Sequence, residues 1–378
     1  PEGATDEGVQ VVAGFVFVFL FYMAAILFGY AIANSVVEEK QSRIVEILAA
    51  AIPLRQLLVG KVVGATVLAL GQMVLFRRDR QGAMILITHR SSQRPQRRWL
   101  AWLLAGLTVV SMLFTHAVPL GDPNLSWRVV WQQLPGALAF TVCMMAILTV
   151  HEWGHYVVAR RFGVAVSLPY LIPFPGSPFG TMGAVILMRE TPPTRRALLL
   201  ISAAGPLAGL LMSLPVLAIG LLLSEVSSLP VGEPYIMEGN SLLYGALKWL
   251  VFGRWLPGGG QDVLLHPVAW AGWAGLWVTS MNLLPAAQLD GGHVARALLG
   301  SRARYVTWAV IGVALLLSLG WTGWLVWAVL IYAVARQDAP PADDLTPLER
   351  PERWLAVALL LILVLTFTPL PLQLVHPL

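Results

Sequence analysis

Long runs of apolar residues, separated by shorter polar segments, make up most of the chain. Because a helix needs about 20 consecutive apolar residues to cross a bilayer, these runs predict membrane-spanning helices. The apolar stretch at 304–335 is too long for one span and is interrupted at SLGWTG, which predicts two spans there. The expected spans are 11–34, 55–76, 99–118, 135–158, 197–223, 264–284, two within 304–335, and 354–370. The pattern therefore predicts an all-α polytopic membrane protein.

Two segments depart from this pattern. Residues 163–190 are rich in Pro and Gly and end in alternating apolar and polar positions. Non-helical backbone at membrane depth needs protein or a water-filled cavity to satisfy it, so we expect a small β-hairpin or sheet at about 164–190. Residues 240–256 form a shorter apolar segment with Lys248 and Arg254, which predicts an interfacial or re-entrant helix.

The composition supports an integral membrane protein. Of the residues, 57% are hydrophobic and 12% are charged, whereas soluble domains have about 25% charged residues. The net charge of +5 comes with no nucleic-acid-binding motif, so we expect no nucleic-acid partner. The single cysteine, Cys143, excludes an internal disulfide and a CxxC metal site, and its apolar surroundings favour a packing role.

The arginines near the span ends predict the orientation of the helices. Excess Lys and Arg mark cytoplasmic loops. The arginines that flank the expected spans are Arg97, Arg98, Arg160, Arg161, Arg195, Arg196, Arg296, Arg302 and Arg304. These positions are mutually consistent if all of them are cytoplasmic. The C-terminal end of the span at 135–158 then lies near the cytoplasmic side.

The segment HEWGH, residues 151–155, places titratable groups at the end of that apolar run. Positions i and i+4 of a helix lie on one face, so His151 and His155 can offer two imidazoles to one metal ion. Glu152 is close enough to act as a general base, as in HExxH zinc hydrolases. The alternative is a hydrogen-bonded polar trio inside a helix bundle. We favour the metal site because ionisable groups at membrane depth are mostly functional.

A zinc hydrolase needs a third protein ligand beside an open position. Asp290, in NLLPAAQLDGG at 282–292, is the best candidate because it also follows an apolar span. Pro285 stops the preceding helix, and we expect Gly291 and Gly292 to allow a sharp turn at the metal. The alternative for Asp290 is an N-cap of a helix at 293–299.

At these residues the chain resembles the site-2 proteases, which are intramembrane zinc metalloproteases, over about residues 84–370. HEWGH resembles the catalytic helix of that family, and GTMGAVI at 180–186 resembles its edge strand near the active site. AAGPLAG at 203–209 resembles its small-residue motif, and NLLPAAQLDGGH at 282–293 resembles the motif that supplies the third ligand. No insertion of the size of a PDZ domain separates these motifs, so the compact type without PDZ or CBS modules is the nearest.

The resemblance implies an intramembrane zinc metalloendopeptidase with site-2 protease core helices. Its substrate would be a transmembrane protein, cleaved in or near a membrane-spanning segment within the lipid bilayer. One Zn²⁺ per chain would be bound by His151, His155 and Asp290, with Glu152 as the catalytic base. The residues expected on the substrate side are Asn282, Gly180, Thr181, Met182 and Gly183. The residues expected to support the motifs are Gly205, Pro206, Pro285, Gly291 and Gly292.

The first part of the chain resembles a different family. VVEEKQSRIVEILAAAIPLRQLLVGK, at 36–61, is similar to the permease subunit of an ABC-2-type exporter, and no Walker A motif is present. If that segment is cytoplasmic, the span at 55–76 leads to seven arginines on the outer side. This would contradict the rule that arginines are enriched in cytoplasmic loops. We therefore divide the chain into a two-span permease-like segment at 1–76, a basic linker at 77–98 and a metalloprotease domain at 99–370. The alternative function is a membrane transporter with a passive protease-like half.

Overall fold

The computed structural model describes residues 74–78, 84–88, 98–118, 126–188, 190–230, 232, 235–335 and 340–375. The chain forms two units, Pro1–Ser91 and Ser92–Leu378. In the first unit the described residues form an antiparallel hairpin of β1 (Val74–Arg78) and β2 (Met84–Thr88). The sequence predicted only a basic linker at 77–98 and did not predict a hairpin there. Residues 74–76, which were expected at the end of a helical span, lie in strand β1. The predicted span at 11–34 and residues 55–73 lie outside the described residues.

Three helices of the second unit are long and apolar enough to cross a membrane: α3 (Arg98–Ala117), α4 (Trp127–Arg161) and α5 (Arg195–Leu222). They correspond to the predicted spans at 99–118, 135–158 and 197–223. Helix α4 has 35 residues and is therefore about 52 Å long at 1.5 Å per residue. Because the hydrocarbon core is about 30 Å thick, α4 is longer than one membrane crossing requires.

The remaining helices are shorter. Their bounds are α6 (Leu242–Phe252), α7 (Pro267–Leu283), α8 (Asp290–Leu299), the 3₁₀ turn η1 (Gly300–Arg302), α9 (Ala303–Leu317), α10 (Gly323–Val334) and α11 (Arg350–Thr366). Helix α7 matches the predicted span at 264–284, and α9 and α10 divide the stretch at 304–335 at the predicted interruption. The predicted fold class, an all-α membrane protein with a small β-hairpin, is confirmed.

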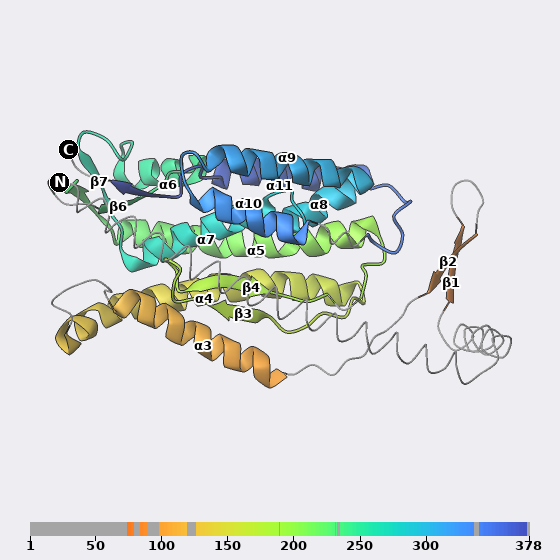
Figure 1. Cartoon of the computed structure of the whole chain (residues 1–378), viewed down its shortest axis with the longest axis horizontal. Coiled ribbons are helices and arrows are strands. Elements are labelled where there is room, and N and C mark those ends of the chain that lie inside the picture. Colours follow the sequence, from red (N-terminus) through yellow and green to blue (C-terminus); the bar gives the residue numbers. More distant parts are fainter. Residues whose placement is uncertain are drawn as a thin grey trace. The chain divides into compact units, whose positions relative to one another are not determined.

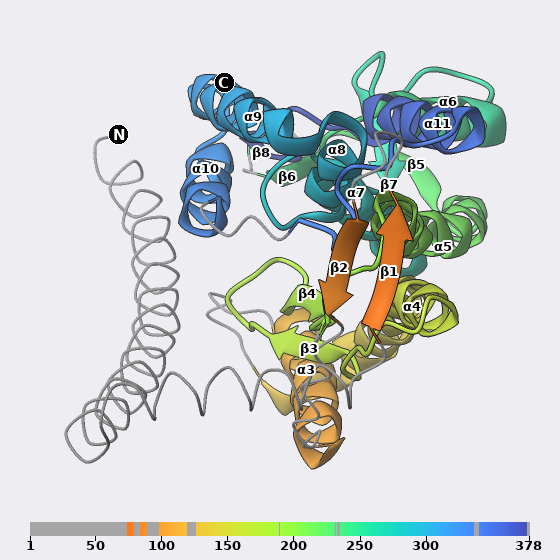
Figure 2. The ribbon, with the colours of Figure 1, turned by 90° about the vertical axis from the view of Figure 1, so that its right-hand side faces the viewer.

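Helices α4, α5 and α7 pack together and form the main core (Figures 1 and 2). Helix α3 packs on α4, and α8 lies against α5. Glycines permit these close contacts: a Cβ on Gly154 of α4 would lie 2.5 Å from the Ala204 carbonyl of α5, and one on Gly272 of α7 would lie 2.5 Å from the Leu217 backbone of α5. Small residues at such positions are typical of helix association in membranes.

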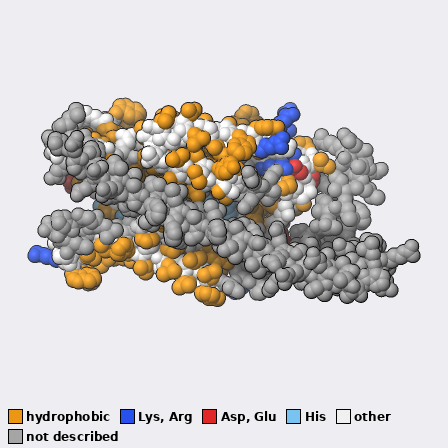
Figure 3. All heavy atoms as spheres, viewed as in Figure 1, with side chains coloured by type: hydrophobic (Ala, Val, Ile, Leu, Met, Phe, Trp, Pro, Cys, Tyr) orange, Lys and Arg blue, Asp and Glu red, His pale blue; other side chains and the backbone are white. Residues whose placement is uncertain are grey.

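Hydrophobic side chains cover much of the helical surface that Figure 3 exposes, while Lys and Arg side chains gather mainly towards one end. Large apolar side chains such as Trp102, Leu211 and Leu316 are 69–75% exposed. An apolar outer surface is what a bilayer requires of a membrane protein, so the surface agrees with the predicted membrane location.

The predicted hairpin at 164–190 consists of β3 (Tyr170–Pro173) and β4 (Thr181–Val185). The strands are antiparallel, with Leu171 opposite Ala184 and a register shift before Pro173. The Ser111 hydroxyl of α3 donates a hydrogen bond of 2.6 Å to the Gly180 carbonyl at the start of β4. Among the described residues, β4 pairs with β3 alone.

Two further sheets, which the sequence pattern did not predict, lie with α6 at one end of the helices. Strand β5 (Glu225–Ser228) pairs with β7 (Gln261–Leu264), and β6 (Tyr235–Glu238) pairs with β8 (Leu372–Val375). Each strand has four residues, too few for a clear alternating pattern, and the partners are distant in sequence. The predicted interfacial or re-entrant helix at 240–256 corresponds to α6.

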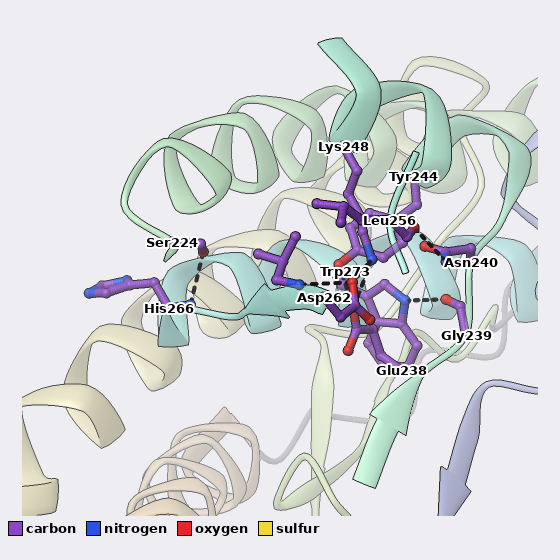
Figure 4. Close-up of polar contacts among 11 residues, drawn as sticks. Ser224, Glu238, Gly239, Asn240, Tyr244, Lys248, Leu256, Asp262, His266 and Trp273 are labelled. Atoms are coloured by element: carbon purple, nitrogen blue, oxygen red, sulfur yellow. Dashed lines mark hydrogen bonds and ion pairs between the residues drawn. The ribbon is translucent and has the colours of Figure 1, made fainter. Parts of the chain in front are cut away.

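Lys248 of α6 lies at the centre of a buried cluster of charges (Figure 4). Its ammonium lies 2.9 Å from Asp262 Oδ1 and 3.4 Å from Glu238 Oε1, and the Tyr244 hydroxyl donates a 2.8 Å hydrogen bond to the same Glu238 oxygen. Burial raises the pKa of the Glu238 carboxyl, although Lys248 and Tyr244 act in the opposite direction. The cluster ties α6 to β6 and β7, and the Trp273 indole ties the same region to α7 by a hydrogen bond to the Gly239 carbonyl.

We expect Lys248→Ala to lower the free energy of unfolding by about 3–5 kcal/mol, because it leaves buried carboxylates without their cation. Chemical unfolding of the purified protein in detergent measures the change. Arg254→Ala is the matched control, because Arg254 is an exposed cation that bonds Gln261 at 2.9 Å on the same side of the molecule. An exposed pair is worth less than about 1 kcal/mol. Equal effects of the two substitutions would contradict a stabilising role for the cluster.

Candidate metal centre

Helix α4 places three polar side chains of HEWGH in the interior. His151 and Glu152 are 4% and 5% exposed, and the His155 side chain is 12% exposed. Because His151 and His155 are one helical turn apart, both rings face the same side of α4. Their Nε2 atoms are 3.2 Å apart. The two imidazoles therefore converge on one point, as the sequence pattern predicted.

Asp290 completes a triangle with the two histidines. Its Oδ2 atom lies 3.4 Å from His151 Nε2 and 3.2 Å from His155 Nε2. Tetrahedral zinc with bonds of about 2.0–2.1 Å places its ligand atoms roughly 3.3 Å apart. All three edges of the triangle agree with this spacing, so the donor set fits a zinc ion with a fourth position left for water or substrate. Among the described residues, these three form the group of His, Cys, Asp or Glu side chains that could hold a metal.

The orientation of His155 is fixed from α5. Its Nδ1 lies 2.7 Å from the Ile201 carbonyl oxygen, so Nδ1 donates the proton and Nε2 is left to bind the metal. Such a partner sets the tautomer and the ring position of a metal-binding histidine. Pro206 lies on the following turn of α5 and has no N–H to donate, which interrupts the regular hydrogen-bond pattern there.

Two glycines of AAGPLAG leave room for the imidazoles. A Cβ on Gly205 would collide with the His155 ring, and one on Gly209 would lie 2.8 Å from His151 Nδ1. Gly205 was predicted as a supporting residue, whereas Gly209 and the Ile201 carbonyl were not. The spacing of Gly205 and Gly209, one helical turn apart like the two histidines, could have identified Gly209. The role of the Ile201 carbonyl could not have been predicted, because every residue type carries the same backbone carbonyl.

Asp290 is the first residue of α8, and Leu289 holds the N-cap position without a side-chain bond. The alternative role of Asp290 as an N-cap is therefore not what the structure shows. Helix α7 ends at Leu283, just before Pro285, as predicted, because a residue before proline avoids the helical conformation.

The turn between α7 and α8 differs from the expectation that glycines would make it. The residue with positive φ is Ala287, at 48°, and its N–H donates to the Thr307 hydroxyl at 3.1 Å. Gly291 and Gly292 lie in the first turn of α8 instead, against the carbonyls of residues 283–284 and 286–287. Their role is thus to permit close packing of α8 on the preceding turn.

The residues expected on the substrate side lie in two places. Asn282, at the end of α7, has its Nδ2 atom 3.4 Å from His151 Nε2, which places its amide beside the metal ligands. The segment Gly180–Gly183 belongs to the β3–β4 hairpin, where the contacts of Thr181 are with Ser177 and Ile172 of the hairpin itself. Met182 lies in β4, and Gly183 has a φ of 96°. The structure therefore brings Asn282 to the candidate ligands, while the side-chain hydrogen bonds of Gly180–Gly183 join it to the hairpin and to α3.

Comparison with known proteins identifies a peptidase family. The model of Peptidase family M50 matches residues 139–319, which include all three ligand candidates. "Probable zinc metalloprotease EGY2, chloroplastic" of Arabidopsis thaliana is 31% identical over 281 residues, which are 72% of this chain and 49% of that protein. "Probable zinc metalloprotease EGY1, chloroplastic" of Oryza sativa subsp. japonica is 32% identical over 249 residues, or 62% of this chain and 41% of that protein. The chain thus spans at most about half of the length of these relatives. Residues 139–319 belong to peptidase family M50, the site-2 protease family.

Proposed function

We propose that the protein is an intramembrane zinc endopeptidase that hydrolyses a peptide bond in or near a transmembrane segment of another membrane protein. The observation on which this rests is the triangle of His151, His155 and Asp290, with edges of 3.2–3.4 Å, at a helix long and apolar enough to cross a membrane. The names of the EGY relatives, which are called zinc metalloproteases, support the same reaction class.

Zinc bound by these three residues would supply a Lewis acid and lower the pKa of a water molecule towards 7. The ligands lie among apolar helices, so the attraction between zinc and the Asp290 carboxylate is weakly screened. Gly205 and the Ile201 carbonyl hold the His155 ring in place before the metal arrives. Because the His155 ring is already positioned, it would lose little conformational freedom when a metal binds.

Glu152 moves the proton in this proposal. It follows the ligand candidate His151 on α4 and is 5% exposed. It accepts a proton from the attacking water and later passes it to the nitrogen of the departing peptide, as general acid–base catalysis requires. Glu152 is not one of the three ligand candidates, so its carboxylate remains available for this transfer.

Asn282 and β4 position the substrate. The Asn282 amide, which lies beside the ligands, donates a hydrogen bond to the carbonyl oxygen that becomes negative during the attack. The edge of β4 opposite β3 pairs with an unwound segment of the substrate by strand addition. A peptide bond inside a transmembrane helix is shielded by the surrounding turns. Strand pairing extends the peptide and so exposes that bond.

The arginines favour an active site towards the cytoplasm. Arg160 and Arg161 end α4, Arg195 and Arg196 begin α5, and Arg296 lies in the last turn of α8. Because α4 and α5 are joined at this end, these arginines gather at one end of the second unit. The positive-inside rule places that end in the cytoplasm, and HEWGH lies within three turns of it.

We expect the purified protein to contain about one zinc per chain, and Asp290→Ala to lose most of it, because one of three ligands is removed. Metal analysis after dialysis measures the ratio. Glu225→Gln is the control, since Glu225 is an exposed carboxylate in β5 and its loss should leave zinc unchanged. Full zinc content in the Asp290 variant would refute the ligand assignment.

Glu152→Gln should keep zinc and lose proteolysis, by about 10²–10⁴-fold, because the amide cannot accept the proton. The assay measures cleavage of a reporter protein with one transmembrane segment, reconstituted in vesicles with the enzyme. The Glu225→Gln variant should cleave at the rate of the unmodified chain. If the Glu152 variant retains substantial turnover, another group is the base.

We further propose that the permease-like residues 1–76 are dispensable for the protease. All the ligand candidates lie in the second unit, Ser92–Leu378. A chain of residues 84–378 should therefore hold about one zinc and cleave the same reporter at a similar rate. Zinc content and cleavage are compared with the full chain in the same vesicles. Loss of both on truncation would show that the first 83 residues contribute to the working enzyme.

A further inference from the structure

The segment that leads from α10 into α11 meets the ends of two helices that form the metal site. It contacts the start of α5 through backbone bonds from Ala342 N to the Pro192 carbonyl and from Asp343 N to the Pro193 carbonyl, at 2.9 and 3.0 Å. The next residue, Asp344, contacts both α5 and α8 with its side chain. This segment is far from the metal ligands in sequence, and the proposed reaction assigns it no role.

Asp344 links an arginine of α5 to an arginine of α8. Arg195 Nε donates to Asp344 Oδ1 at 2.9 Å. Arg296 donates through both terminal nitrogens, with Nη2 at 2.8 Å from Oδ2 and Nη1 at 3.3 Å from Oδ1. A bidentate pair of this kind fixes geometry as well as distance. The Arg195 guanidinium also lies against the end of α8, because a Cβ on Gly300 would be 2.9 Å from its Nη2 atom.

The two arginines of this link are largely buried, while the Asp344 side chain is 32% exposed. The Arg296 side chain is 10% exposed and that of Arg195 is 19% exposed. Two guanidinium groups close together repel each other unless an anion lies between them, and Asp344 pairs with both. Without its charge, the two guanidinium groups would repel each other and loosen the contact between the start of α5 and the end of α8.

Asp344 is itself held in place by its neighbour. Asp343 is buried and accepts hydrogen bonds from Leu345 N and Thr346 N, both at 3.1 Å, and from the Thr346 hydroxyl at 2.7 Å. These bonds close a tight turn around Asp344. The carboxylate is therefore presented to the arginines by a rigid loop, and little order is lost when the ion pairs form.

The two linked helices hold the two parts of the metal site. Helix α5 orients His155 through the Ile201 carbonyl and makes room for it at Gly205. Helix α8 begins at Asp290 and reaches Arg296 after about 9 Å, at 1.5 Å per residue. Because metal ligands must be placed within about 0.2 Å, a tilt of this short helix would move the Asp290 carboxylate away from the imidazoles.

We infer that Asp344 is a positioning residue of the metal site: by joining Arg195 and Arg296 it fixes α8 against α5 and so holds Asp290 at the correct distance from the two histidines. The inference rests on the proposed zinc site and extends it to a residue that does not contact the metal.

Asp344→Asn tests the inference in the full chain. We expect zinc to dissociate about tenfold faster, towards the lower end of the 10–100-fold effects that outer residues of metal sites show. Transfer of zinc to a coloured chelator measures the rate without any proteolysis. The cobalt-loaded protein should also show an altered visible spectrum, which reports the arrangement of the ligands and which a general loss of stability would leave unchanged.

Glu352→Gln is the matched control. Glu352 Oε1 lies 3.2 Å from Arg196 Nε, and this ion pair joins α5 to α11. This variant should release zinc at the rate of the unmodified chain. Equal rates in the Asp344 variant and the unmodified chain would overturn the inference, as would equally accelerated release in both variants.

Arg296→Lys decides the matter if Asp344→Asn does not fold. Lysine keeps the charge but cannot form the bidentate pair, so zinc release should still be faster, and an unchanged rate would overturn the inference. Absence of zinc from the unmodified chain would contradict the proposed function itself. An unchanged release rate in the variants of a zinc-containing protein would contradict only the role of Asp344.

Discussion

The close contact between α4 and α5 is the constraint on which the metal site depends. Gly154 of α4 lies against the Ala204 carbonyl, while Gly205 and Gly209 of α5 lie against the two imidazoles. Lipid-exposed helices associate through packing rather than through the hydrophobic effect, so small residues serve two purposes here. They bring the helices together, and they create the space in which the histidine rings face each other. A larger side chain at Gly205 would push His155 away from the carbonyl that orients it.

Two buried cations among the described residues are paired with carboxylates. Lys248 is enclosed by Glu238 and Asp262, and Arg296 is paired with Asp344. An isolated charge in a low-dielectric interior is costly, and membrane helices leave few places where water can relieve it. The ionic groups outside the metal site therefore join secondary-structure elements that are distant in sequence.

The described helices and the candidate metal ligands could be predicted from the sequence because their signals are local. Apolar runs of the right length located α3, α4 and α5, and the spacing of His151 and His155 placed both rings on one face. The four-residue strands β5 to β8 could not be predicted, since their pairing joins distant segments. Ala287 was missed because its left-handed conformation, which usually favours glycine, depends on a hydrogen bond to Thr307 of another helix.

Helix α8 shows why the motif that contains Asp290 does not by itself define a metal site. A helix of ten residues is marginal in isolation, so its position must come from tertiary contacts. Its first turn is set by close packing of Gly291 and Gly292 on the preceding carbonyls, and its last turn by the pairing of Arg296. The distance between Asp290 and the histidines is thus a property of α5, α7, α8 and the segment before α11 together. The residues that position the candidate ligands therefore extend well beyond the ligands themselves.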